Sequence, residues 1–473
     1  MINLEPTASA IEANTSGRPG YIWGISLVAA LGGLLFGYDW VVIGGAKPFY
    51  EKFFRLTTSA EIGWAMSCAL VGCLAGALLS GGLSDRFGRK RLLVLSAALF
   101  AISSLGTGAA GGYLSFVGWR MLGGVAIGLA SNLSPMYIAE VAPAAVRGKL
   151  VSLNQLTIVI GILLAQFVNW LIAQPVAPGA SAEAILNSWN GQTGWRYMFA
   201  VTAIPSLIFL FGMLFVPESP RWLVKNGKAE LARATLASIG GPAYADRALA
   251  SIEATLVNET GRVDFRQLLE PRVARILALG VTLAVFQQWC GINVIFNYAE
   301  EVFSAAGYQV SDILLNIVIT GAVNLVFTFV AIATVDRAGR RVLMLVGAGG
   351  LTVIYTLLGA CYFTHSKGIH VLVLVVSAIG CYSCSLAPIT WVVISEIFPN
   401  RIRGAAMSVA VSALWIACFI LTYSFPWLNR HLGPAGTFWI YAGICLAGLV
   451  YIQLKLPETK GKTLEEIETE LVD

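Results

Sequence analysis

Ser84-Asp85-Arg86-Phe87-Gly88-Arg89-Lys90 is a short charged stretch between two long apolar runs, and Val335-Asp336-Arg337-Ala338-Gly339-Arg340-Arg341 repeats it in the second half of the chain. Two further landmarks recur in the same order. Glu140-Val141-Ala142-Pro143 matches Glu396-Ile397-Phe398-Pro399, and Pro217-Glu218-Ser219 matches Pro457-Glu458-Thr459. The three pairs are separated by 251, 256 and 240 residues. Three ordered, near-equal offsets predict an internal duplication.

The composition restricts the class of protein. Hydrophobic residues make up 57% of the 473 residues and charged residues 12%, whereas soluble domains average about 45–50% and about 25%. The mean hydropathy is +0.74. Too few charged side chains remain to cover a water-exposed surface, which excludes a soluble cytosolic enzyme.

Apolar runs of about 20 residues, the length that crosses about 30 Å of hydrocarbon, occur throughout the chain. The duplication places six runs in each half. We therefore predict an all-α membrane protein with twelve transmembrane helices in two pseudo-symmetric six-helix halves. The expected spans are 22–46, 62–83, 91–110, 114–138, 150–172, 195–216, 276–303, 312–335, 341–363, 370–395, 404–427 and 435–455.

The loops and ends complete the predicted organisation. We expect no cleavable signal peptide in residues 1–20, which carry one basic residue and no apolar core. Ala-rich runs at 228–239 and 243–258 predict short amphipathic helices between the halves, where a packing collar is favoured over a regulatory role. The predicted divisions are a cytoplasmic N-terminal segment 1–20, a first half 21–216, an intracellular helical connector 217–275, a second half 276–456 and a cytoplasmic tail 457–473.

Basic residues indicate the orientation. With both termini placed inside, the inner segments hold 24 Lys and Arg and the outer segments six, and leaving out the connector still gives 15 against six. This asymmetry follows the positive-inside rule. The net charge of +5 is thus a topology signal and indicates no nucleic-acid partner. We expect a multi-pass protein of the cell membrane that functions as a monomer in the lipid bilayer.

No residues form a recognisable catalytic or metal-binding pattern. All eight cysteines fall inside predicted spans, and the Cys381-x-x-Cys384 pair has no second pair or histidine cluster to complete a metal site. We therefore expect no cofactor, no metal and no enzymatic activity. A duplicated membrane protein favours a transporter over a channel or receptor, because a site between two halves can face each side in turn.

Several motifs carry a family resemblance. They are the loop landmarks, the run 32–39 (Gly-Gly-Leu-Leu-Phe-Gly-Tyr-Asp), Gln287-Gln288 with Gly291 and Asn293, and the run 217–222 (Pro-Glu-Ser-Pro-Arg-Trp). Together they resemble the sugar porter family of the major facilitator superfamily from about residue 21 to 464. The motifs are most similar to those of bacterial proton-coupled pentose and hexose symporters of the xylose type. The resemblance implies transport of a monosaccharide with a proton.

A sugar needs amide partners for its hydroxyls and an aromatic ring for its apolar face. Gln287 lies twelve residues beyond Arg275, near the midplane, and only unwinding at Gly291 would let Asn293 share its cavity. Amides that merely bond neighbouring helices are the alternative, most of all for Asn324. By resemblance, the sugar-binding positions are Gln155, Gln287, Gln288, Asn293, Asn324, Trp391 and Trp415, with Phe36 and Asn297 as possible further contacts.

Departures from the family pattern bear on the substrate. The chain has Asn297-Tyr298 where the family often has two tyrosines, and Ala387 where many members have Gly. Leu414 and Cys418 stand where relatives tend to carry amides. A changed hydroxyl preference is the hypothesis, and polyols or inositol remain open as substrates.

The repeated inner-loop charges predict a gate. Acidic and basic residues occur together at equivalent loops of both halves, which favours a latch that closes the inner side, as the family resemblance also implies. A solvated positive face is the alternative. The predicted inner-gate residues are Asp85, Arg89, Glu140, Arg147, Asp336, Arg340, Glu396 and Arg403.

Asp39 is the carboxylate that lies well inside a span, and Arg120 is the base inside a span. Counted along their helices, both fall in the outer third of the membrane. A buried charge needs a partner, so we expect the two to pair. Proton-coupled members carry Asp at the position of Asp39, which implies that its protonation releases Arg120. A facilitative carrier and, more distantly, a sugar sensor are the alternative functions.

Overall fold

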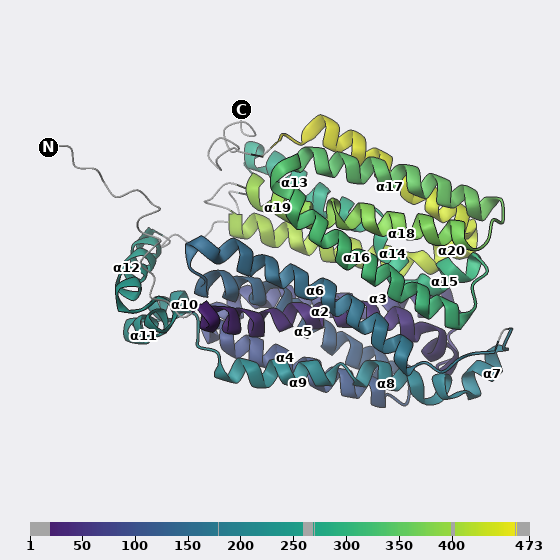
Figure 1. The fold of residues 1–473 in the computed structure, drawn as a ribbon, viewed down its shortest axis with the longest axis horizontal. Helices are drawn as coiled ribbons and strands as arrows, with labels where there is room; N and C mark the ends of the chain where they lie inside the picture. The colour runs from purple at the N-terminus through teal and green to yellow at the C-terminus, as the bar shows by residue number, and fades with distance from the viewer. Residues whose placement is uncertain are drawn as a thin grey trace.

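The computed structural model describes residues 19–177, 179–258, 268, 270–398, 403–458 and 460. Long helices dominate the first half and run side by side (Figure 1). Their bounds are α2 Pro19–Phe53, α3 Ser59–Phe87, α4 Arg89–Ala109, α5 Tyr113–Val141, α6 Ala144–Ile172, α7 Ala182–Asn187, the π-helix η1 Asn190–Gly194, α8 Trp195–Ala200 and α9 Ala203–Phe215.

The second half repeats this arrangement in a separate layer (Figure 1). Short helices α10 Pro220–Lys225, α11 Ala229–Gly240 and α12 Pro242–Asn258 join the two layers. The helices of the second half are α13 Pro271–Trp289, α14 Ile292–Asn297, α15 Ala299–Ala305, α16 Val310–Ala338, α17 Arg340–Phe363, α18 Ile369–Ser383, α19 Leu386–Ile397 and α20 Arg403–Lys455.

The helix α20 accounts for two of the twelve expected spans. Over the described residues, eleven helical segments are long and apolar enough to cross a membrane, and α20 is the longest at 53 residues. A straight helix of that length would be about 80 Å long, far more than one crossing needs. Gly433 interrupts it with φ 66° and ψ 175°, and Pro434 follows directly. The break separates the eleventh span from the twelfth, so the predicted twelve-helix architecture is confirmed.

Two spans of the second half are broken near their middles. The seventh is divided into α13, α14 and α15, with Gly291 at φ 86° between the first two. The tenth is divided into α18 and α19, and Pro388 lies in the first turn of α19. Broken helices in a membrane protein occur where the freed backbone lines a cavity between halves. These breaks therefore mark the region in which to look for a site.

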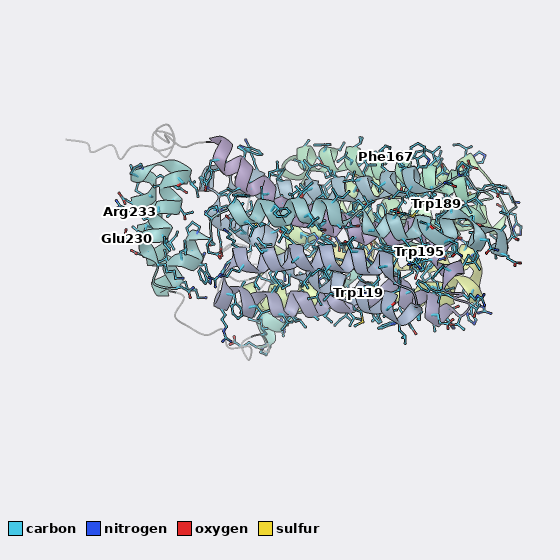
Figure 2. The ribbon with its side chains drawn as sticks, turned by 90° about the horizontal axis from the view of Figure 1, so that it is seen from below. Trp119, Phe167, Trp189, Trp195, Glu230 and Arg233 are labelled. Carbon is cyan, nitrogen blue, oxygen red and sulfur yellow. The ribbon has the colours of Figure 1, made fainter. Side chains whose placement is uncertain are left out.

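The connector lies at one end of the bundle. The helices α10 to α12 project beyond the long helices, while α7 lies at the opposite end (Figure 1). Figure 2 shows Glu230 and Arg233 on α11 in the projecting part, and Trp119, Phe167, Trp189 and Trp195 in the bundle itself. Arg233 pairs with Asp246 of α12 at 2.7 Å. The pair lowers the pKa of the Asp246 carboxyl and raises that of Arg233.

The surface of the bundle is apolar. Leu114, Phe215 and Leu454 are 84%, 87% and 73% exposed, and many other large hydrophobic side chains are exposed along the long helices. A soluble monomer does not leave so much apolar surface in water. The surface is that of a protein surrounded by lipid, and the chain is a multi-pass membrane protein.

Candidate functional site

Asp39 on α2 and Arg120 on α5 form a buried ion pair. Arg120 Nη1 lies 2.7 Å from Asp39 Oδ1, and the two residues are 5% and 3% exposed. The Arg120 guanidinium also lies 5.3 Å from the ring centre of Phe199. Arg120 thus turns inward to Asp39 and not outward to the lipid headgroups. Each charge is neutralised inside a region from which water is largely excluded.

The break at Gly291 brings the amides of the seventh span together. Gln288 Nε2 donates to Gln287 Oε1 at 2.8 Å, and Asn293 Nδ2 donates to Gln288 Oε1. All three residues are at most 8% exposed. Gly291 adopts the left-handed conformation that other residues rarely adopt, and this turn reorients α14 relative to α13. The unwinding expected at this glycine is present, and it lets side chains from both segments meet.

Three aromatic rings meet about one helical turn from the point where α20 contacts this amide cluster. Phe36 and Trp40 of α2 each lie about 6 Å from Trp415 of α20, at 5.9 and 6.0 Å between ring centres. Trp415 is 4% exposed, and its Nε1 has no hydrogen-bond partner among the described residues. On the same helix, Cys418 Sγ lies 3.7 Å from Asn293 Nδ2. The arrangement offers an apolar ring surface, and an indole N–H unpaired in the described part of the chain, about one helical turn from several amides, which is the chemistry a sugar requires.

The other predicted sugar-binding residues differ from one another in burial and in hydrogen bonding. Asn324 Oδ1 accepts a hydrogen bond from Ser383 at 2.7 Å, which joins α16 to α18 and fits the helix-bonding alternative. Gln155 on α6 is half-buried, and Trp391 on α19 is 38% exposed. Asn297 at the end of α14 is 5% exposed, and its Oδ1 has no partner among the described residues.

Gln166 is a candidate that sequence reasoning missed. It lies on α6, is 1% exposed, and neither of its amide atoms has a partner among the described residues. Its Oε1 approaches Gly321 of α16 so closely that a Cβ there would lie 1.9 Å away. An unpaired buried amide between the two halves is costly unless a ligand or water satisfies it. A polar residue in an apolar run was the available signal.

The inner charges of the first half form one network. Arg89 at the start of α4 contacts Glu140 at 3.0 Å and Asp85 at 3.1 Å. Glu218 Oε1 accepts from the backbone N–H groups of Arg89 and Lys90, both at 3.0 Å. These contacts cap the first turn of α4 with a carboxylate, where the helix dipole favours negative charge.

The second half reproduces this network. Arg340 contacts Glu396 at 3.4 Å, and Glu458 accepts from the backbone N–H of Arg340 at 2.8 Å and of Arg341 at 3.1 Å. The side chains of Asp336 and Arg403 lie outside those that the structure describes. Arg147 is exposed and has no ion-pair partner among the described side chains. The ion pairs of Arg89 and Arg340 described above lie each within one half of the chain and do not join the two halves.

The capping role of Glu218 and Glu458 explains why glycine recurs in the repeated motif. Gly88 and Gly339 have φ 96° and 91° with ψ near 150°, a region that is essentially restricted to glycine. A Cβ at Gly88 would lie 2.2 Å from Glu218 Oε2, and one at Gly339 would lie 2.7 Å from Glu458 Oε2. The third repeat landmark, Pro-Glu, was the signal for these two carboxylates, whose role sequence reasoning missed.

A second buried charge cluster lies at the other end of the bundle. Lys47 Nζ of α2 lies 2.7 Å from Glu51, 3.1 Å from Glu300 and 2.8 Å from Glu301. The Lys47 side chain is 4% exposed. Since Glu300 and Glu301 belong to α15, this cluster joins the first half to the second. Lys47 directly follows the predicted span 22–46 and is one of the six outer basic residues. The two adjacent acids Glu300 and Glu301, after the Gln-Gln motif, were the available signal for the cluster.

The contact between α3 and α20 lies at the same end. A Cβ at Gly63 would lie 2.4 Å from the carbonyl oxygen of Tyr423, and the rings of Trp64 and Phe419 are 6.1 Å apart. The two halves therefore meet closely at the end that carries Lys47.

Comparisons with known proteins agree with this architecture. The family described as "Sugar (and other) transporter" matches residues 25–471. The D-xylose-proton symporter of Escherichia coli is 41% identical, with 96% of each chain covered. The arabinose-proton symporter of Bacillus subtilis is 37% identical, with 98% of this chain and 97% of the relative covered.

Solved structures give the same result. The inward-open xylose transporter of E. coli superimposes with a TM-score of 0.83 at 38% identity, covering 95% of this chain and all of that one. The xylose symporter bound to 6-bromo-6-deoxy-D-glucose gives a TM-score of 0.78 at 40% identity, covering 96% and 99%. The chain thus belongs to the sugar transporter family and has the major facilitator fold. Members of this family are transport proteins and not enzymes.

Proposed function

We propose that this chain is a proton-coupled monosaccharide symporter that works by alternating access between its two halves. The observation that carries the proposal is the buried pair of Asp39 with Arg120, 2.7 Å apart. Among the described residues, Arg120 is the one charged partner of Asp39. Protonation of Asp39 would remove the negative charge that holds this pair together. The names of the xylose-proton and arabinose-proton relatives support proton coupling and make aldopentoses the first substrates to test.

The sugar site we propose lies where the amides of α13 and α14 meet the rings of α2 and α20. Gln287, Gln288 and Asn293 supply hydrogen bonds, and Trp415 supplies a stacking surface and an N–H. A myo-inositol transporter is 35% identical over 94% of this chain. Because Asn297, Leu414 and Cys418 depart from the family pattern in this region, inositol belongs in the substrate panel.

The gates we propose use the charges at the two ends. The Lys47 cluster closes the outer side. The TM-score of 0.83 with the inward-open xylose transporter, against 0.78 with the symporter bound to 6-bromo-6-deoxy-D-glucose, supports this assignment. When the inner side closes, Arg147 of the first half binds the second half, and Arg403 of the second half binds the first. The exposure of Arg147 supports this proposal. The protein then lies in the cell membrane as a monomer with both termini in the cytoplasm.

The test is sugar-driven proton movement in proteoliposomes. The wild-type protein is expected to take up protons when xylose, arabinose or glucose is added, and its sugar accumulation is expected to fall as the external pH rises, since the inward proton gradient that drives it then becomes smaller. Asp39→Asn mimics the protonated form permanently, so it is expected to abolish accumulation while sparing downhill counterflow. A variant that still concentrates sugar under a proton gradient would contradict the assignment, and wild-type transport without proton uptake would identify a facilitative carrier.

A further inference from the structure

A small cavity separates the ion pair from the broken seventh span. Its volume is about 20 Å³, and residues of α2, α3, α5 and α14 line it. Asp39, Arg120 and Asn297 provide its polar walls, with Trp40 and Cys73 among the others. A cavity of this size holds one water molecule when two to four polar groups surround it.

Three polar atoms of these walls have no partner among the described residues. They are Asp39 Oδ2, Arg120 Nε and Asn297 Oδ1. Their residues are at most 5% exposed, so bulk water does not satisfy them. Leaving a buried polar atom unpaired is costly, and a carboxylate oxygen is the most costly of the three. One water molecule can accept from Arg120 Nε and donate to both oxygens, which satisfies all three atoms at once.

The helix α14 connects this cavity with the amide cluster. Asn293 and Asn297 are four residues apart, so they lie on the same face of α14. Asn293 contacts Gln288 and Cys418, while Asn297 lines the cavity beside Asp39. Gly44 of α2 permits the close approach, because a Cβ there would lie 2.8 Å from the Phe296 carbonyl oxygen and 3.0 Å from that of Asn297. The six-residue helix α14 begins at the turn of Gly291 and packs against Gly44 at its other end. A movement of Asn297 can therefore be passed along α14 to Asn293.

We propose that Asn297 is a positioning residue that couples the proton site to the sugar site through a water molecule in this cavity. The proposal rests on the proposed symport function. While Asp39 is ionised, the water donates to Asp39 Oδ2 and to Asn297 Oδ1. When Asp39 is protonated on Oδ2, its hydroxyl donates to the water, and the water has to turn to accept this hydrogen bond. The pair with Arg120 loosens and the position of α14, with Asn293, changes in the same step.

The groups around Asp39 leave few other sources for a pH response. Arg120 faces it from α5, Cys73 and Cys68 from α3, and Tyr38 lies next to it on α2. Among the described residues that line the cavity, Asp39 is the single carboxyl group. The carboxylates of the Lys47 cluster lie outside this cavity, so the difference between the pH profiles of matched Asn297 variants, and not one profile alone, reports on the surroundings of Asp39.

The test compares Asn297→Leu with Asn297→Ser in proteoliposomes. Leu removes the oxygen and fills the cavity, so the carboxylate loses a hydrogen-bond donor and its neutral form is favoured. The external pH at which sugar-driven proton uptake is half-maximal is expected to rise by about one unit. Ser keeps a hydroxyl that can hold the water, so its midpoint is expected to remain that of the wild type. Asn316→Leu, which removes an equally buried amide on α16, is the control and is expected to leave the midpoint unchanged.

Each outcome decides the proposal. An unchanged midpoint in Asn297→Leu with a raised KM for sugar would overturn it and make Asn297 a direct sugar contact. Should the Leu variant fail to show counterflow, Asn297→Val removes the same oxygen and still occupies the place of the water with less bulk, and its midpoint must move in the same direction. Wild-type protein without sugar-driven proton uptake would refute symport itself, whereas normal uptake with identical midpoints in all Asn297 variants would refute only the coupling.

Discussion

At the scale of single residues, Trp415 can offer a sugar both a ring surface for stacking and an N–H group for hydrogen bonding. Its ring lies against Phe36 and Trp40, and its Nε1 has no partner among the described residues. Trp415→Phe keeps a ring but removes the N–H, so the KM for sugar is expected to rise roughly fivefold, as for a lost hydrogen bond of about 1 kcal/mol. Initial rates of labelled sugar uptake measure this change.

The control for Trp415 is an indole whose N–H is already occupied. Trp439 Nε1 donates to the Thr356 carbonyl oxygen at 3.2 Å, away from the amide cluster. Trp439→Phe is expected to leave KM unchanged. Equal effects of the two substitutions would indicate that Trp415 only fills space.

Some residue pairs could be predicted from the sequence and others could not. The depth of Asp39 and Arg120 along their helices placed both in the outer third, and the structure pairs them. The break at Gly291 followed from the need to turn Asn293 toward Gln287. The Lys47 cluster and the bond between Ser383 and Asn324 could not be predicted, because they depend on which spans are neighbours and on how each is rotated.

At the scale of helices, the two capping glycines predict a matched set of variants. Gly88→Ala and Gly339→Ala each force a side chain into a glycine-only conformation and against a capping carboxylate. Each is expected to cost about 1–3 kcal/mol and, for a chain of this length, to lower the apparent melting temperature in detergent by roughly 1–3 °C. Thermal unfolding followed by size-exclusion chromatography measures the loss.

Gly81 supplies the control for these variants. It lies on the same helix as Asp85, and a Cβ there would meet nothing within 4 Å. Gly81→Ala is expected to be neutral or slightly stabilising, because Ala favours a helix more than Gly does. Equal melting temperatures of Gly88→Ala and Gly81→Ala would show that a side chain at position 88 strains neither the backbone nor the contact with Glu218.

At the scale of the whole molecule, the Lys47 cluster holds the two halves together at one end. Lys47→Met removes the ammonium group that Glu51 of α2 shares with Glu300 and Glu301 of α15, which favours separation of α15 from α2. Cys73 lines the cavity beside Asp39, so a hydrophilic thiol reagent added outside is expected to label it roughly tenfold faster in this variant. The rate of Cys73 labelling, measured by mass spectrometry, is the readout.

Two companion variants define the direction of this effect. Lys52→Met removes a nearby lysine that is 3.8 Å from Glu51 but forms no ion pair with α15 among the described residues, and its labelling rate is expected to match the wild type. Arg147→Ala weakens closure of the inner side and is expected to slow both the labelling of Cys73 and transport. Faster labelling in all three variants would point to general loosening and not to a gate.

The architecture as a whole was the most predictable level, because length, hydropathy and repeat offsets depend little on side-chain packing. Twelve spans, two halves and the connector helices near 228–239 and 243–258 all followed from those features. The junction inside α20 was the exception. The sequence predicts a loop over 428–434 between the eleventh and twelfth spans, whereas the structure changes direction only at Gly433 and Pro434.

The self-contained capping of each half has a consequence for how the protein is made. The ion pair of Asp39, the network of Arg89 and the cap by Glu218 all lie between residues 19 and 225. The ribosome has therefore completed every one of these partners before it begins the second half. We expect two separately encoded polypeptides, divided after Asn258, to assemble in the same cell into a working carrier. A first fragment ending before Glu218 is expected to be degraded, and recovery of transport with that shorter fragment would contradict the idea.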